Sequence, residues 1–87
     1  MNRNGKLLIP LGQMQGGQTG TVVQISGGRG LVNRLQALGI RPGKRITKVS
    51  SMFMRGPITI QMDGVQFALG FGMARQVLVE LNTGDSR

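Results

Sequence analysis

A short leucine-lined segment that ends in glycine constrains this chain more than any other feature. The range Leu31–Gly43 reads LVNRLQALGIRPG, and its leucines at positions i, i+4 and i+7 share one stripe of an α-helix. Gly39 directly follows Leu38, where a helix that ends in the left-handed conformation needs a residue without a Cβ atom. Ile40 is placed to pack back on the last helical turn. The sequence therefore predicts a helix over residues 31–38, with Leu35 at the centre of its apolar stripe.

Three sequence signals predict tight turns after this helix. Pro42 and Gly43 occupy the two central positions of a type II turn, because proline fixes φ and glycine permits the positive φ that follows. The pair Gly56-Pro57 marks another turn. Asp63 followed by Gly64 is the strongest short hairpin signal in the sequence.

Alternating apolar residues predict short strands between these turns. The first clear strand covers 19–25, with Thr21, Val23 and Ile25 expected on one face. In the strand over 45–50, Ile46 and Val49 are three residues apart, which indicates a bulge. The other predicted strands cover 58–62, 65–69 and 77–81, residues 70–74 form one tight helical turn, and residues 9–11 lie as an edge segment.

About five short strands joined by tight turns predict a mainly β fold. Such strands must hide their edges, and a small curled barrel does so, with glycines and a bulge at its corners. One short helix then follows the first clear strand and caps an end of the barrel with its leucines, and the one-turn helix precedes the last strand. A single sheet with the helix on one face is the competing architecture.

Length and composition bound the rest. The 87 residues suffice for one domain, which we place at 7–81 between polar tails at 1–6 and 82–87. The apolar run at 7–9 ends at Pro10, far too short for a secretory signal or a membrane span, which favours a cytoplasmic location. The formal charge of +8, from 11 basic and 3 acidic residues, favours anionic partners such as nucleic acid, an acidic protein face or a membrane leaflet.

The residue inventory argues against catalysis and against a metal site. There is no His and no Cys, so the commonest general base and the strongest nucleophile are missing. The three carboxylates are Asp63, Glu80 and Asp85, and they suggest no acid/base pair. The same inventory offers neither the Cys and His that transition metals prefer nor clustered carboxylates for harder ions. We therefore predict no catalytic residue, no metal ligand and no cofactor.

A run of basic residues occupies the middle of the chain without one acidic residue among them: Arg29, Arg34, Arg41, Lys44, Arg45, Lys48 and Arg55. Nucleic acid is one candidate partner for such a run. The exposed aromatic rings on which small barrels stack bases are scarce, however, because the chain has no Trp or Tyr. The apolar segment Met52-Phe53-Met54 is either a contact surface or a cover over an open end of the barrel.

Two longer stretches resemble one known family. They read GGRGLVNRLQALGIRPGKRI and FALGFGMARQVLVEL, and their most specific part is Arg34-Leu35-x-x-Leu38-Gly39-Ile40-x-Pro42-Gly43. In order and spacing they are similar to the FeoA family, over about residues 11–81. The resemblance implies an SH3-like β-barrel with a short helical insertion and no enzymatic activity. It also implies a cytoplasmic accessory protein of bacterial ferrous iron uptake that contacts the cytoplasmic GTPase domain of the FeoB membrane transporter. The family carries a transition-metal-binding label, which the absence of Cys and His in this chain does not support.

We therefore expect an adaptor that is peripheral to the membrane through its partner. The residues expected to bind that partner are Arg29, Leu31, Arg34, Leu35, Leu38, Arg41, Lys44, Met52, Phe53 and Met54. The leucines first serve the fold, and whatever part of the stripe the barrel leaves uncovered serves the partner. Three alternatives remain open: a nucleic-acid-binding barrel, homo-oligomerisation through Met52-Phe53-Met54, and a relative of the C-terminal module of metal-responsive repressors. The last is disfavoured because only a tail precedes the domain.

Overall fold

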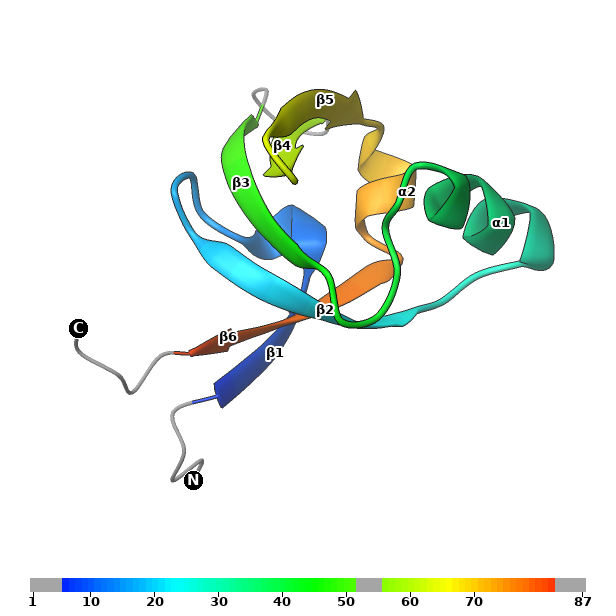
Figure 1. Ribbon diagram of the computed structural model, residues 1–87, viewed down its shortest axis with the longest axis horizontal. Coiled ribbons are helices and arrows are strands. Elements are labelled where there is room, and N and C mark those ends of the chain that lie inside the picture. The colour runs from blue at the N-terminus through cyan, green and yellow to red at the C-terminus, as the bar shows by residue number, and fades with distance from the viewer. Residues whose placement is uncertain (1–5, 52–55, 83–87) are drawn as a thin grey trace.

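A curled antiparallel sheet forms the body of the protein in a computed structural model, which describes residues 6–51 and 56–82 (Figure 1). Within these residues the sheet has six strands in the order β1-β6-β2-β3-β4-β5. The strands are β1 (Lys6–Pro10), β2 (Thr19–Ile25), β3 (Arg45–Ser51), β4 (Ile58–Met62), β5 (Val65–Leu69) and β6 (Val77–Asn82). The helical elements are the 3₁₀ turn η1 (Leu11–Gln13), α1 (Arg29–Ala37) and α2 (Phe71–Ala74).

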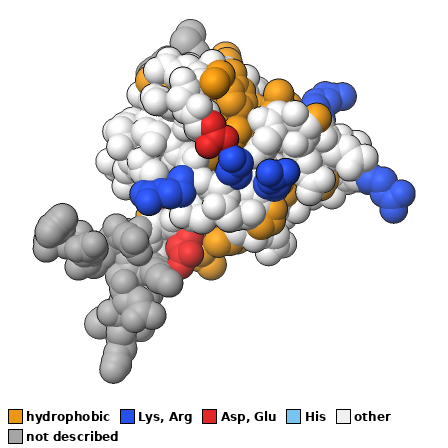
Figure 2. Space-filling model, viewed as in Figure 1, with side chains coloured by type: hydrophobic (Ala, Val, Ile, Leu, Met, Phe, Trp, Pro, Cys, Tyr) orange, Lys and Arg blue, Asp and Glu red, His pale blue; other side chains and the backbone are white. Residues whose placement is uncertain are grey.

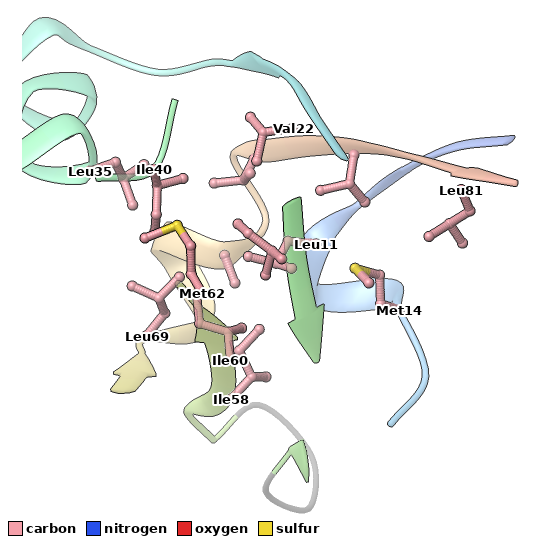
Figure 3. Packing of buried hydrophobic residues seen from close by; sticks show 14 residues of the cluster. Leu11, Met14, Val22, Leu35, Ile40, Ile58, Ile60, Met62, Leu69 and Leu81 are labelled. Carbon is pink, nitrogen blue, oxygen red and sulfur yellow. The ribbon is translucent and has the colours of Figure 1, made fainter. Parts of the chain in front are cut away.

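The core fills the inside of the curled sheet. β3, β4 and β5 lie across from β1, β6 and β2, with η1 and α2 between the two groups (Figure 1). Each strand of the sheet except β1 contributes side chains to one buried apolar cluster, and η1, α1 and α2 add their own (Figure 3). The prediction of a small, mainly β fold is confirmed. The expected edge segment is itself a strand, because β1 pairs with β6 along its whole length.

The predicted end of α1 is confirmed in atomic detail. Gly39 has φ of +94°, and its N–H donates to the Gln36 carbonyl at 2.9 Å. The N–H of Ile40 donates to the Leu35 carbonyl at 3.0 Å, which completes a Schellman motif. The Leu35 and Ile40 side chains are both fully buried and point toward Met62 (Figure 3). The helix begins at Arg29, earlier than the expected residue 31.

Two bulges decide which side chains enter the core. The β3 bulge is confirmed, since the register against β4 shifts between Lys48 and Ser50. In β2 the expected face of Thr21, Val23 and Ile25 is wrong: Val22 is buried, and both Thr21 and Val23 are only partly covered. The register against β6 shifts between Val22 and Gln24, so Ile25 packs against the core on the face of Val22 and does not share a face with Thr21 and Val23.

The predicted tight turns are confirmed where the structure describes them. Gly43 has φ of +96°, and the Lys44 N–H donates to the Arg41 carbonyl at 3.1 Å. Asp63 and Gly64 have φ of 55° and 81°, the pair of positive values that a type I′ hairpin requires. Gly56 and Pro57 lie just before β4, and the turn predicted there extends into residues 52–55, outside the described residues. Both predicted tails also lie largely outside them.

Candidate protein-interaction surface

The end of α1 lies against the hairpin that joins β4 to β5. A Cβ atom built on Gly39 would come within 3.2 Å of Met62 Cε, so the two segments touch at this glycine. On the far side of the turn, Lys44 Nζ donates to Asp63 Oδ2 at 2.6 Å in an ion pair. An apolar contact and an ion pair therefore hold the turn after α1 in a fixed position beside the hairpin.

Two exposed apolar side chains flank this contact. Leu38, the C-cap of α1, is 44% exposed, and Val65, the first residue of β5, is 58% exposed. Val65 pairs with Met62 in the ladder, so their side chains share one face of the sheet, and Met62 reaches the glycine next to Leu38. Leu38 precedes Gly39 in the chain and Val65 is the ladder partner of Met62, so both residues are neighbours of the Met62–Gly39 contact.

Charged residues belong to the same helix, turn and hairpin as the apolar pair. Arg34 lies one helical turn before Leu38, on the same side of α1, and is exposed. Arg41 is exposed in the turn that Lys44 closes. We call this set the α1–hairpin surface: Arg34, Leu38, Arg41, Lys44, Asp63 and Val65. Figure 2 shows exposed hydrophobic side chains beside basic and acidic ones on this side of the molecule.

The structure divides the residues that the sequence predicted to bind a partner. Arg29, Arg34, Leu38 and Arg41 are exposed. Leu31 is half-buried and packs on the core, and Leu35 is 0% exposed, so a partner of the folded domain cannot touch the Leu35 side chain. Lys44 is half-buried and paired with Asp63. Met52, Phe53 and Met54 lie outside the described residues.

Sequence reasoning missed the role of one lysine in the basic run. Lys48 is only 4% exposed, and its Nζ donates to the carbonyls of Gly12 at 3.0 Å and Met14 at 2.5 Å. Burial lowers the pKa of Lys48 below its ordinary value of 10.5. The alternation with the buried Ile46, two residues earlier in β3, was the signal that could have placed it inside.

The carboxylates of the described residues are few, and they do not cluster. In residues 6–51 and 56–82 no group of three or more His, Cys, Asp or Glu side chains could hold a metal ion. Asp63 is engaged by Lys44, and Glu80 also has an interaction partner. No helix within those same ranges is both long and apolar enough to cross a membrane.

Known proteins are similar to this chain in sequence and in fold. The family model described as "FeoA domain" matches residues 9–81. A protein of Methanocaldococcus jannaschii named "Putative Fe(2+) transport protein A" is 30% identical over 73 residues, which cover 84% of this chain and 87% of that protein. The crystal structure of an iron uptake regulatory protein (FeoA) is 41% identical, with a TM-score of 0.78, and the match covers 86% of this chain and 99% of the other.

A larger protein contains the same fold as one of its parts. A manganese-dependent transcriptional repressor matches with a TM-score of 0.79 and 24% identity, over 85% of this chain but 41% of the repressor. At this identity the likeness concerns the SH3-like fold alone. The family match spans nearly the whole described domain, from within β1 to within β6, and includes the helix end, the turns and the closing strand that carry the resemblance. The chain therefore belongs to the FeoA family.

Proposed function

We propose that this protein is a cytoplasmic accessory protein of ferrous iron uptake that binds the cytoplasmic GTPase part of a FeoB-like membrane transporter. Family membership supports the link to iron transport, because two of the relatives are named for Fe(2+) transport and iron uptake. The protein reaches the membrane through this partner and acts by binding. The observation that carries the proposal is the pair of exposed apolar side chains, Leu38 and Val65, on the α1–hairpin surface.

The setting of Leu38 and Val65 suits a binding site. The Schellman motif fixes the backbone at Leu38, and the type I′ hairpin fixes it at Val65, so a partner would lose little backbone entropy in binding there. Fully burying a Leu or Val side chain is worth about 1.5–3 kcal/mol, and roughly half of that is still available at each position. Arg34 and Arg41 at the rim favour a partner surface with acidic residues.

Direct binding to the cytoplasmic part of the transporter tests this proposal. Leu38→Ser and Val65→Ser should each weaken binding about tenfold, because each removes an apolar contact near the centre of the interface. Leu8→Ser is the matched control: Leu8 is 55% exposed, on β1 at the opposite edge of the sheet, and its replacement should leave the affinity unchanged. All three variants should melt close to the wild-type temperature.

The proposal fails if folded Leu38→Ser and Val65→Ser variants bind the partner as tightly as the wild type. Arg34→Glu is a further probe, since it reverses a rim charge and should slow association. Leu35→Gln is unsuitable, because Leu35 is fully buried and its replacement would disturb the fold itself.

The structure weakens the alternative of a nucleic-acid partner. Within the basic run, Lys48 is buried against carbonyls and Lys44 is paired with Asp63. A gel shift with RNA at increasing salt tests that alternative, and tight binding at physiological salt would favour it over the adaptor. Homo-oligomerisation through Met52-Phe53-Met54 stays a prediction, which light scattering of a triple serine variant would test.

A further inference from the structure

A pocket of about 420 Å³ lies away from the α1–hairpin surface, between η1 and α2. Its lining residues are Pro10, Gly12, Gln13, Phe71 and Arg75. The two short helical elements that form its walls contact each other inside the curled sheet (Figure 1). The volume is within the range of small-molecule sites.

The α2 wall combines a ring with a cation. Phe71 and Arg75 are four residues apart, and the Arg75 N–H donates to the Phe71 carbonyl at 3.1 Å, so one helical turn places both on the same face. Phe71 is half-buried and Arg75 is exposed. Arg75 forms no ion pair with any residue in the described ranges, which leaves its guanidinium available to a ligand.

The η1 wall is held rigidly from behind. Lys48 Nζ bonds to the carbonyls of Gly12 and Met14, so the Gly12 carbonyl is already engaged and a positive charge stands close to the wall. Pro10 adds an apolar ring, and the exposed Gln13 adds an amide. The lining contains no acidic residue. The pocket therefore combines apolar rings with positive potential.

We propose that this pocket binds a carboxylate carried on an apolar group, with Arg75 pairing the carboxylate and the rings of Phe71 and Pro10 covering the apolar part. The planar guanidinium matches a carboxylate through two parallel N–H donors. A phosphate would want several cations, and the lining offers one. The same chemistry occurs at the C-terminus of a peptide that ends in an apolar residue and in a free aromatic carboxylic acid.

Titration of the ¹⁵N-labelled full chain with 3-phenylpropionate, followed by NMR, tests the site. We expect saturable shifts at the amides of Gly12, Gln13, Phe71 and Arg75, with a Kd of roughly 1 mM, as befits a small ligand. The neutral 3-phenylpropionamide should bind at least about tenfold more weakly, as the loss of one charge-assisted hydrogen bond predicts.

Arg75→Gln should weaken 3-phenylpropionate binding about tenfold for the same reason, and it should leave the melting temperature unchanged because Arg75 is exposed. Arg45→Gln is the matched control, since it removes an exposed arginine from β3, and it should bind like the wild type. A peptide that ends in Phe with a free carboxylate, compared with its C-terminal amide, distinguishes the two sources. If the peptide binds more tightly than 3-phenylpropionate, the site is assigned to a protein C-terminus. If the two bind equally, the site is assigned to a free carboxylic acid. Absence of saturable shifts, equal binding of acid and amide, or an unchanged Kd in Arg75→Gln would overturn the assignment.

Discussion

Replacing the buried lysine with methionine probes how the fold is held together. Lys48→Met keeps an unbranched side chain of similar length in the core but removes the ammonium group that bonds to the Gly12 and Met14 carbonyls. Those two hydrogen bonds tie the segment after β1 to β3, across 34 and 36 residues of sequence. The variant therefore asks whether that polar clamp stabilises the domain beyond what apolar packing supplies.

The expected loss of stability follows from the two carbonyls. A buried acceptor left without a donor costs about 1–3 kcal/mol, and the Met14 carbonyl has the more buried of the two bonds. The partly covered Gly12 carbonyl can form a hydrogen bond to water instead. Removing a desolvated charge also offsets part of the lost stability. The net destabilisation should be about 2 kcal/mol, or roughly 10 °C in Tm for a domain of this size. Lys44→Met is the matched control, and breaking its more exposed ion pair should cost at most about 1 kcal/mol.

The pH dependence gives this prediction a second readout. Burial lowers the folded-state pKa of Lys48 below 10.5, so between the lowered value and 10.5 the unfolded chain holds a proton that the folded chain has released. Stability rises with pH wherever the unfolded state binds more protons. The wild type should therefore gain stability relative to Lys48→Met as the pH is raised toward 10.5, and the difference between the two should widen.

Urea unfolding of the wild type, Lys48→Met and Lys44→Met across this pH range provides the free energies of unfolding. A Lys48→Met variant as stable as the wild type at neutral pH would refute the claim that the Lys48 hydrogen bonds stabilise the domain. A stability difference that narrows as the pH rises would refute the direction assigned to the Lys48 pKa.

Three further substitutions test single contacts, with thermal melts as the measurement. Gly39→Val should cost at least about 2 kcal/mol, because it places a β-branched residue at φ of +94° with its Cβ 3.2 Å from Met62 Cε; a melt that matched the wild type would remove the left-handed cap. Gly20→Ala should cost about 1–3 kcal/mol, since the new Cβ would come within 2.9 Å of Leu81 Cδ2, and an unchanged Tm would mean that this leucine moves freely aside. Leu35→Ala should cost about 2–5 kcal/mol as a cavity in the core, and a loss below 1 kcal/mol would contradict its complete burial.

Local backbone chemistry made much of the fold predictable. A glycine at the end of a leucine stripe, Pro-Gly in a reversal and Asp-Gly between alternating strands each admit few conformations, and each took the expected one. The β3 bulge was also predicted, from the spacing of Ile46 and Val49, although the structure buries Ile46 and Lys48 and leaves Val49 exposed.

The β2 bulge and the candidate site depended on long-range pairing, which local patterns do not report. No residue pattern within 19–25 indicates that the pairing register with β6 shifts after Val22. The exposure of Val65 depends on how closely the turn after α1 packs on the β4–β5 hairpin, and the burial of Lys48 depends on carbonyls more than 30 residues away. The sequence placed Leu38 within the apolar stripe, and only the assembled domain shows that Leu38, unlike Leu35, remains exposed.

Methyl NMR of the domain, titrated with the cytoplasmic part of a FeoB-like transporter, tests the proposed interface most directly. The methyl signals of Leu38 and Val65 should shift or broaden at substoichiometric partner, while those of Leu7 and Leu8 on β1 stay in place, although all four side chains are exposed. Perturbation confined to Leu7 and Leu8, or no perturbation at any of the four residues at saturating partner, would contradict the assignment of the interface to the α1–hairpin surface.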